Sequence, residues 1–411
     1  MFSYKSNKLF CESVSIEKIV KKTGTPVYIY SKKQLSGNYN SYDAAFKGYP
    51  HIICFAVKSN SNYHLCKTLF DSGAGADVTS GGELYRSLNA GASPSKIVYA
   101  GVGKSRQEIE YAVKSNILMF NVESVEELKL INDVAGKSNK KVDIAFRVNP
   151  GIDPHTHKHI STGLSETKFG IPIKNIVETY VFAGQYKNIR LTGIHCHIGS
   201  QITEISPFNT MAKTLEKIYL ELGKNNIHLT HINLGGGLGI TYNNEIPPEI
   251  PRLVNLYLTV FKKYNIKIIL EPGRSIVGNA GIIAAKVLFN KPGENKKFII
   301  VDAGMNDLIR PSFYDAYHKI ITVKKSGSKK SLYDIVGPIC ETGDFLGKSR
   351  ELPVLKQNDL LGILCAGAYG FSMSSQYNSR CRAAEILVDK SDFKIIRRKE
   401  TYRDLISHEN I

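Results

Sequence analysis

Between about residue 50 and residue 275, short runs of apolar residues alternate with longer stretches in which apolar residues recur at helical spacing. The apolar runs have the length of strands and lack a strict apolar–polar alternation, so they predict parallel strands that are buried on both faces. Repeated strand–helix units of this kind predict a (β/α)8 TIM barrel. The runs that we assign to its strands are 52–59, 76–80, 96–101, 118–124, 143–150, 191–200, 231–239 and 266–274.

The intervening stretches carry signals for the start and the end of helices. In the stretch 124–135, Ser124 precedes the apolar pattern and Glu127 follows three residues later, which is the spacing of a capping box. The stretch 81–92 has Gly91 just beyond its helical part, where a glycine commonly ends a helix. These signals support the alternation of strands and helices.

Residues that can carry chemistry gather where the predicted strands end. In (β/α)8 barrels the carboxyl ends of the strands form the face on which active sites lie. Core packing alone does not explain charged groups and imidazoles at these positions. The residues concerned are Lys58, Asp77, Arg147, His197, Gly235, Gly236, Gly237, Glu271 and Arg274.

After about residue 280 the pattern changes to short strands without helices between them. The stretch 281–304 predicts a hairpin with a Pro-Gly turn, and the following strands predict an all-β domain, either a small barrel or a sandwich. The stretch 25–31 could add a strand to it, so that both chain ends build this domain. We therefore predict a barrel domain over 32–278 and a β domain made of 1–31 and 279–411.

The composition is that of a globular protein that acts on small molecules. Hydrophobic residues make up 42% and charged residues 22% of the 411 residues, and no apolar run is long enough to span a bilayer. The N-terminus lacks the pattern of a targeting segment. The formal net charge of +17 is spread along the chain without a nucleic-acid-binding motif, so we expect anionic small substrates, no membrane and no nucleic acid.

The seven cysteines are widely spaced, odd in number and without a CxxC pair. This pattern argues against a disulfide framework and against a cysteine-rich zinc site. We expect reduced thiols and a cytoplasmic location.

Cys340, in GPICETGD (337–344), stands out because carboxylates and glycines surround it. From its position alone it could be a packing residue, a metal ligand or a catalytic thiol.

Lys58 and Glu271 lie at the ends of the first and the last predicted strand. Desolvation at the end of a buried strand lowers the pKa of a lysine, which suits an amine that attacks a carbonyl group. A carboxylate at the other position could bind a protonated cofactor nitrogen, and Arg274 could hold a carboxylate or a phosphate. The alternatives are a lysine at a strand end whose amine reaches solvent, and a simple Glu271–Arg274 ion pair.

Two further patterns could bind a cofactor. The glycines 235–237 follow the seventh strand, where backbone N–H groups often bind phosphate, although many such turns serve only to reverse the chain. His195 and His197 flank Cys196, and a zinc site is one interpretation. Strand alternation separates the thiol from the imidazoles, so we favour an imidazole against a flat cofactor ring, with Ser200 at a phosphate, and expect no metal.

Eight motifs follow one another in an order that resembles a known family. They are AVKSN (56–60), ADVTSGGEL (76–84), FRVNPGID (146–153), HCHIGSQ (195–201), GGGLG (235–239), EPGRS (271–275), GPICETGD (337–344) and GAYG (367–370). Together they resemble the fold-type III pyridoxal phosphate decarboxylases with an alanine-racemase-like barrel, most closely the diaminopimelate decarboxylases. The resemblance extends over essentially the whole chain.

The resemblance implies a pyridoxal phosphate bound in the barrel. Lys58 would carry it covalently and take part in catalysis, His197 would stack on its ring, and Glu271 would bind its ring nitrogen. The phosphate and the rest of the cofactor would be surrounded by Ser200, Gly236, Gly237, Arg274, Tyr369, Asp77, Arg147 and Gly273.

The resemblance also implies the substrate contacts and the assembly. Arg310 and Tyr314 would hold the far carboxylate of the substrate, and Glu341 would meet its far ammonium. Cys340 would be the catalytic proton donor. In this family the segment with the cysteine comes from the partner subunit, so that active sites form only in a homodimer. Additional substrate contacts would come from Arg274 and Tyr369.

Acid–base chemistry agrees with the role of Cys340. A thiol with an ordinary pKa is mostly protonated at neutral pH and can still release its proton. Asp344 would normally be ionised and is a poor donor. The expected reaction is the decarboxylation of meso-2,6-diaminopimelate to L-lysine and carbon dioxide.

A distal pocket with both Arg310 and Glu341 fits the zwitterionic end of diaminopimelate, whereas an arginine would repel the cationic end of ornithine. The alternatives are a decarboxylase of carboxynorspermidine, ornithine or arginine, and a catalytically silent regulator. The presence of Lys58, Glu271 and Cys340 speaks against the silent regulator.

Overall fold

The computed structural model describes residues 1–153 and 167–410. The chain divides into two compact units. We call Asn38–Ile240 with Ile246–Ser275 the barrel unit, and Met1–Gly37, Thr241–Glu245 and Ile276–Ile411 the β unit. The segment Thr241–Glu245 belongs to the β unit although its chain neighbours belong to the barrel unit.

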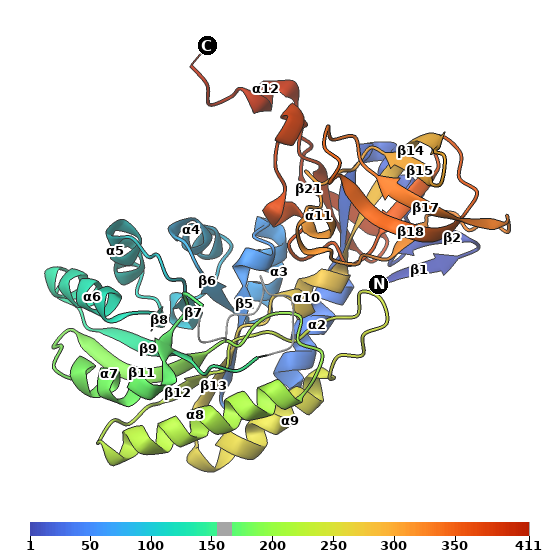
Figure 1. Ribbon diagram of the computed structural model, residues 1–411. Helices are drawn as coiled ribbons and strands as arrows, with labels where there is room; N and C mark the ends of the chain where they lie inside the picture. The colour runs from blue at the N-terminus through green and yellow to red at the C-terminus, as the bar shows by residue number, and fades with distance from the viewer. Residues whose placement is uncertain (154–166, 411) are drawn as a thin grey trace. The chain divides into compact units, whose positions relative to one another are not determined.

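Among the described residues of the barrel unit, eight parallel strands form a closed barrel (Figure 1). Each strand pairs with the next along the chain, and the ring closes where Ile268 of the last strand pairs with His51 of the first. The predicted (β/α)8 barrel is confirmed. Its strands are β5 (His51–Ala56), β6 (Gly75–Val78), β7 (Ile97–Tyr99), β8 (Met119–Val122), β9 (Val142–Asn149), β11 (Ile189–Cys196), β12 (His231–Asn233) and β13 (Lys267–Leu270), with β10 (Ile171–Pro172) beside β9.

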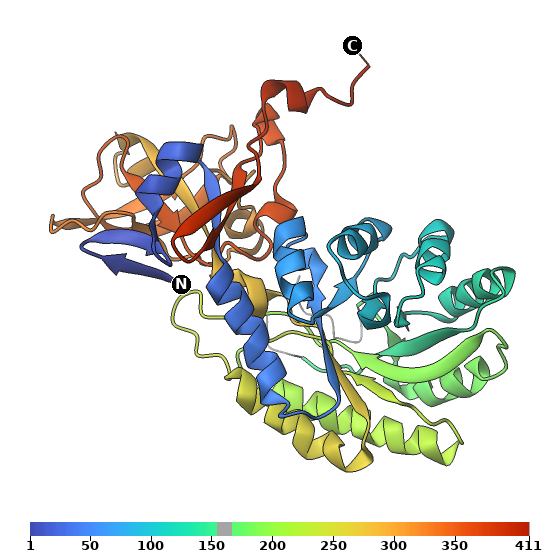
Figure 2. The same ribbon diagram turned by 180° about the vertical axis from the view of Figure 1, so that it is seen from behind.

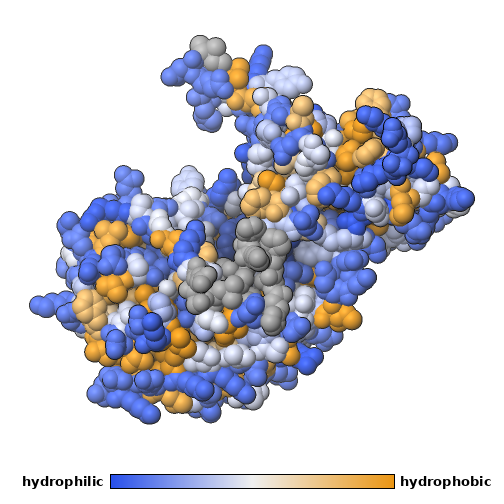
Figure 3. Space-filling model, in the orientation of Figure 1, coloured by the Kyte–Doolittle hydropathy of each residue, from blue (hydrophilic) through white to orange (hydrophobic). Residues whose placement is uncertain are grey.

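Helices cover the outside of the barrel. α8 and α9 lie side by side in both ribbon views (Figures 1 and 2). On the face seen in Figure 3, hydrophilic residues are mixed with hydrophobic ones over these helices, as expected for amphipathic helices that pack on a sheet. The helices are α2 (Lys32–Ala45), which contains the division between the units, α3 (Tyr63–Asp71), α4 (Gly81–Asn89), α5 (Arg106–Lys114), α6 (Val125–Lys137), α7 (Ile176–Ala183), α8 (Ser206–Lys224) and α9 (Ile250–Phe261).

The predicted helix ends are partly correct. Gly91 follows α4 with φ +93°, a left-handed conformation that glycine adopts without strain. Ser124 caps α6 by accepting the N–H of Glu127. The predicted return bond of a capping box is wrong, because the Glu127 carboxylate accepts the N–H of Glu123 instead, at 2.9 Å. The glutamate takes part in a buried network that is described below.

Most described strands of the β unit form one mixed sheet, in which β4 (Val27–Ser31) lies between β14 (Gly281–Pro292) and β20 (Ala384–Asp389). The predicted construction from both chain ends is therefore confirmed. β14 and β15 form the predicted hairpin. The other strands of the sheet are β15 (Lys297–Val301), β16 (Ile320–Thr322), β17 (Lys330–Val336), β18 (Phe345–Pro353), β19 (Leu360–Ile363) and β21 (Asp392–Arg397).

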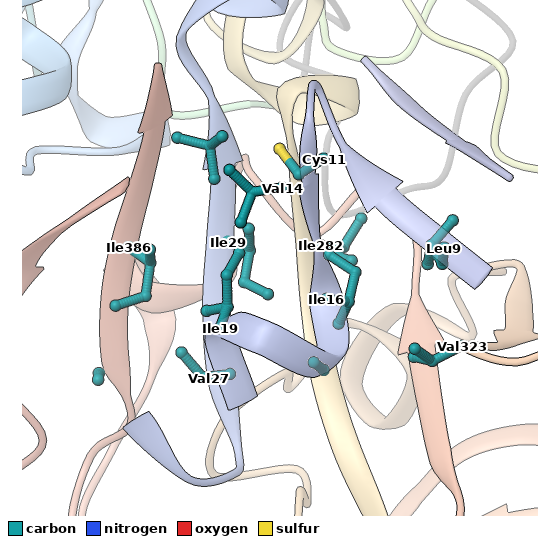
Figure 4. Packing of buried hydrophobic residues seen from close by; sticks show 13 residues of the cluster. Leu9, Cys11, Val14, Ile16, Ile19, Val27, Ile29, Ile282, Val323 and Ile386 are labelled. Atoms are coloured by element: carbon teal, nitrogen blue, oxygen red, sulfur yellow. The ribbon is translucent and has the colours of Figure 1, made fainter. Parts of the chain in front are cut away.

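A small N-terminal sheet and a helix pack onto this mixed sheet. Figure 4 shows their common core, in which side chains from both ends of the chain meet. Burial of such apolar side chains is the main force that holds a domain of this kind together. The added elements are β1 (Phe2–Lys5), β2 (Lys8–Cys11), β3 (Val14–Ser15) and α1 (Ile16–Thr23), and the labelled core residues are Leu9, Cys11, Val14, Ile16, Ile19, Val27, Ile29, Ile282, Val323 and Ile386.

Three short helices complete the fold: α10 (Arg274–Val277), α11 (Arg310–Tyr314) and α12 (Tyr402–Leu405). Within the described ranges, no helix is long and apolar enough to cross a membrane. The seven cysteines all lie in these ranges and are free thiols.

Candidate active site

Lys58 lies in the short turn Val57–Ser59 that follows β5, and it contacts the next strand of the barrel. Its Nζ lies 3.0 Å from Oδ2 of Asp77, which is fully buried in β6. The other carboxylate oxygen, Oδ1 of Asp77, is buried without a hydrogen-bond partner in the described structure. The Lys58 side chain is 39% exposed. The amine is therefore held by a carboxylate, and the lowered pKa that we expected for this lysine stays a prediction.

Glu271 follows β13 in the centre of the barrel face and is buried. Its Oε1 accepts hydrogen bonds from Asn121 at 2.9 Å and Asn233 at 2.6 Å, and its Oε2 accepts one from Nε2 of His195 at 3.2 Å. Burial opposes the charged form, but His195, Lys58 and Asn233 together hold the pKa of Glu271 well below its usual range. The carboxylate is therefore an anion fixed in one orientation.

The two histidines of HCHIGS have separate partners. His195 bonds to Glu271, whereas Nδ1 of His197 accepts the N–H of Gly236 at 3.2 Å. Burial, with help from the charges of Arg147 and Lys58, lowers the pKa of His197 well below its usual range. His197 is thus neutral and carries its proton on Nε2. No group of three metal-binding side chains occurs among the described residues.

The glycine turn after β12 allows neighbouring strand ends to pass close to one another. A Cβ on Gly236 would lie 2.3 Å from the carbonyl oxygen of Glu271, and one on Gly237 would lie 2.7 Å from that of Gly199. Gly235 and Gly237 also have positive φ, at +61° and +107°. Backbone packing therefore explains the glycines without a ligand, and a phosphate at Gly236 or Gly237 stays a prediction.

Ser200 and Arg274, two of the residues predicted at the phosphate, are brought together. NH2 of Arg274 lies 3.1 Å from Oγ of Ser200, and Arg274 is buried. Gly273 allows this segment to approach β5, since a Cβ there would lie 3.0 Å from atoms of Ala56 and Ser59. A hydroxyl and a guanidinium this close together can both donate hydrogen bonds to one anion, so they make a suitable anion site.

Arg147, at the end of β9, is part of a buried ionic network that the sequence did not reveal. Its NH1 lies 2.7 Å from Oε1 of Glu123, and the guanidinium stacks at 4.5 Å over Phe169. Glu127 binds the N–H of Glu123 and forms a 2.6 Å ion pair with Lys104, whose side chain is completely buried. The network thus extends from Lys104, just before α5, to Arg147, whose positive charge helps to lower the pKa of His197.

In the β unit, the GPICETGD turn is held by Asp344. The two carboxylate oxygens of Asp344 accept the N–H groups of Ile339 at 2.7 Å and Met305 at 2.6 Å. Burial raises the pKa of Asp344, so ionisation is a weaker reason to exclude it than we expected. A better reason to exclude Asp344 as the proton donor is that both of its carboxylate oxygens already accept backbone N–H groups. Cys340 itself is exposed, and its N–H donates to Oδ1 of Asn378 at 2.8 Å.

Apart from Arg274, which lies in the barrel unit, the other predicted substrate residues also lie in the β unit. Arg310 begins α11 and is buried, and Tyr314 ends the same helix. A hydrogen bond with Glu341 raises the pKa of the Tyr377 hydroxyl. Tyr369 lies in the GAYG turn with φ +56°. The structure therefore divides the predicted residues between the units: cofactor residues other than Tyr369 lie in the barrel unit.

Comparison with known proteins identifies the family. Residues 32–278 match the family model "Pyridoxal-dependent decarboxylase, pyridoxal binding domain". The diaminopimelate decarboxylase of Aquifex aeolicus is 49% identical over 400 residues, which cover 97% of this chain and 95% of that protein. The chain belongs to the diaminopimelate decarboxylase family. The enzyme of Haemophilus influenzae from this family is 48% identical over 406 residues, covering 98% of both chains.

Solved structures of the family agree with this result. Diaminopimelate decarboxylase from M. jannaschii in complex with L-lysine matches with a TM-score of 0.96 and 38% identity, covering 100% of this chain and 98% of the other. The enzyme from Helicobacter pylori, also complexed with L-lysine, matches with a TM-score of 0.93 and 40% identity, covering 96% and 98%.

The residues at the barrel face fit pyridoxal phosphate, the cofactor of this decarboxylase family. The buried Glu271 anion suits a protonated ring nitrogen, because its negative charge pairs with the positive charge of that nitrogen. Ser200 and Arg274 suit a phosphate, and Lys58 offers a primary amine. The unpartnered Oδ1 of Asp77 leaves an acceptor for a ligand hydrogen-bond donor. The predicted cofactor is confirmed for the family to which the chain belongs.

The Lys104–Glu127 pair makes a stability prediction. We expect Lys104→Met to lower the free energy of unfolding by about 3–5 kcal/mol, because it leaves a buried carboxylate without its cation. Urea unfolding measures the change. The matched control is Lys67→Met, which breaks an exposed pair with Asp71 and should cost less than about 1 kcal/mol. Equal losses in the two variants would contradict a buried network.

The neutral state of His197 makes a pH prediction. Its pKa is depressed, so the ring should stay unprotonated well below pH 6.5, the ordinary value for histidine. In NMR titration of the protein labelled at histidine ring carbons, we expect the His197 signals to stay constant from about pH 8 to 5.5. Assignment uses a His197→Gln variant. A His197 midpoint within this pH range would contradict the neutral state of the ring.

Proposed function

We propose that this protein decarboxylates meso-2,6-diaminopimelate to L-lysine and carbon dioxide with pyridoxal phosphate. The observation that carries the proposal is the likeness to diaminopimelate decarboxylases along nearly the whole chain, in both units. The cofactor, when bound, supplies an electron sink for the pair left behind when the carboxylate departs. The protein has to hold the cofactor, orient the substrate and deliver one proton.

In this proposal Lys58 binds the cofactor covalently and Glu271 holds its ring nitrogen. The low pKa of Glu271 supports this role, since only an ionised carboxylate stabilises a protonated ring. The neutral His197 suits a ring face, because it brings no positive charge to a cationic ring. The remaining proposed cofactor contacts are Asp77, Arg147, Ser200, Gly236, Gly237, Gly273, Arg274 and Tyr369.

The distal end of the substrate is proposed to bind to the β unit. Arg310 and Tyr314 hold the second carboxylate, and Glu341 holds the second ammonium. A buried arginine supports selection of a dicarboxylic substrate, because it repels a distal cation such as that of ornithine. Arg274 and Tyr369 are proposed to contact the substrate as well.

Cys340 is proposed to deliver the proton, from the partner subunit of a homodimer. Its exposure in this chain supports that role, since a thiol that acts on another subunit must be accessible in the monomer. Asp344 and Asn378 support it too, because they hold the backbone N–H groups of Ile339 and Cys340. We also propose a cytoplasmic location, on the odd number and wide spacing of the cysteines.

A substrate comparison tests the proposal. The purified protein with pyridoxal phosphate is assayed for carbon dioxide release from meso-diaminopimelate, ornithine, arginine and carboxynorspermidine at equal concentrations. We expect kcat/KM for diaminopimelate to exceed the others by at least about 100-fold, the size of effect that repulsion of a wrong charge at a buried arginine gives. A higher value for one of the polyamine precursors would instead establish the alternative substrate.

A further inference from the structure

Arg310 is held inside the β unit by His318, a residue that no role has been given. NH1 of Arg310 lies 2.7 Å from Nε2 of His318, and Nδ1 of His318 lies 2.8 Å from the carbonyl oxygen of Leu364. A guanidinium can only donate, so Nε2 must accept and carries no proton. The carbonyl can only accept, so Nδ1 carries the proton. Both bonds together define one neutral tautomer of a fully buried imidazole.

A second side chain restrains the same guanidinium from its face. The Tyr242 ring lies 4.8 Å from the central carbon of the Arg310 guanidinium and meets the His318 ring edge-on at 5.0 Å. Tyr242 belongs to the segment Thr241–Glu245, whose turn is held by Glu245: its Oε2 accepts the N–H of Tyr242 at 3.0 Å and that of Asn243 at 2.7 Å. Because this segment belongs to the β unit, Tyr242 lies in the same unit as Arg310 and contacts its guanidinium.

The two contacts orient Arg310 without cancelling its charge. An imidazole nitrogen and a phenol ring are both uncharged, whereas a carboxylate partner in either place would neutralise the guanidinium. Arginine has many rotamers, and ordering them on binding weakens affinity, so a guanidinium that is ordered beforehand binds a carboxylate more tightly. His318 lies eight residues after Arg310 in the IRPSFYDAYH stretch, and the short α11 lies between them.

We propose that His318 is the positioning residue of Arg310, and that it thereby sets the preference for a substrate with a second carboxylate. The inference rests on the proposed function, since Arg310 must be the group that binds this carboxylate. His318 acts through Arg310 and does not touch the reacting atoms. Its loss should therefore affect substrate binding and selection, and leave the chemical step largely intact.

The test compares three variants with meso-diaminopimelate as substrate. His318→Phe keeps an aromatic ring beside Tyr242 but removes the acceptor, and we expect KM to rise by about tenfold or more, with kcat within about threefold. In His318→Gln the amide oxygen can accept in place of Nε2, and KM should return to within about threefold of the wild type. His228→Phe makes the same change at an exposed site of the barrel unit and should alter neither constant.

Two further readouts exclude a merely structural effect. The ratio of kcat/KM for diaminopimelate to kcat/KM for lysine, which lacks the second carboxylate, should fall in His318→Phe. Binding of pimelate, a dicarboxylate of the same chain length, should weaken by the same factor as KM rises, in a calorimetric titration that needs no turnover. If His318→Phe does not fold, His318→Asn replaces it: its shorter amide does not reach Arg310, so its KM should exceed that of His318→Gln.

The outcomes separate the two proposals. A wild type that produces lysine, together with an unchanged KM and unchanged pimelate binding in the acceptor-free variant, overturns the role of His318 alone. So does a kcat that falls while KM stays constant. A wild type that releases no lysine from diaminopimelate overturns the proposed function and the inference with it.

Discussion

Lys58→Ala is expected to lower kcat for diaminopimelate decarboxylation by at least about 10⁴-fold, because it removes the amine proposed to hold the cofactor and to act in catalysis. The structure gives Lys58 a fixed place, 3.0 Å from the buried Asp77, on the same barrel face as Glu271. A lysine tethered in this way presents its amine in one direction. The matched control is Lys67→Ala, an exposed lysine of α3, which should retain wild-type activity.

The attachment itself can be tested without measuring turnover. Wild-type protein loaded with pyridoxal phosphate is reduced with borohydride, digested and analysed by mass spectrometry. We expect the reduced cofactor on the peptide that contains Lys58, and no such peptide from Lys58→Ala. An adduct on a different lysine, or none at all with the cofactor present, would show that Lys58 has another role.

Cys340→Ala should keep cofactor binding and lose about 10²–10⁴-fold in kcat, the range that a positioned general acid contributes. The thiol is exposed, and the turn around it is fixed by Asp344, so its removal should leave the fold unchanged. Absorbance of bound cofactor and thermal unfolding check these two points. Cys381→Ala, at a half-buried cysteine of the same unit, serves as the control. Near-normal turnover would make Cys340 a surface residue without a catalytic role.

A mixture of variants tests whether Cys340 serves the partner subunit. Random exchange between Lys58→Ala and Cys340→Ala subunits makes half of the dimers mixed, and each mixed dimer has one complete site if the cysteine acts across the interface. The mixture should then recover about 25% of wild-type activity. If each cysteine served its own subunit, no site would be complete and the mixture would stay inactive.

The barrel could be predicted from sequence because its signals are local. Each buried strand is followed by a helical stretch, and parallel strands place their carboxyl ends on one face. That geometry alone brought Lys58, Asp77, Glu271 and Arg274 onto the same face. The contacts between these side chains could not be read from the sequence: Nζ of Lys58, for example, lies 3.0 Å from the buried carboxylate of Asp77.

The residues that the sequence did not reveal depend on distant partners. Asn121 and Asn233 bond to Glu271 from other strands, and their only signal was a single amide within a short strand. Lys104 resembled any other lysine of a basic chain, because its burial depends on Glu127, a distant residue in α6. Tyr242 could not be assigned to the β unit, since its segment interrupts the barrel part of the chain.

The most direct test of the whole account is product analysis. Purified protein with pyridoxal phosphate is incubated with meso-diaminopimelate, and carbon dioxide and amino acids are quantified together. We predict L-lysine and carbon dioxide in equal amounts, with none of either from Lys58→Ala. Carbon dioxide without lysine, or no consumption of diaminopimelate by protein that has bound the cofactor, would contradict it.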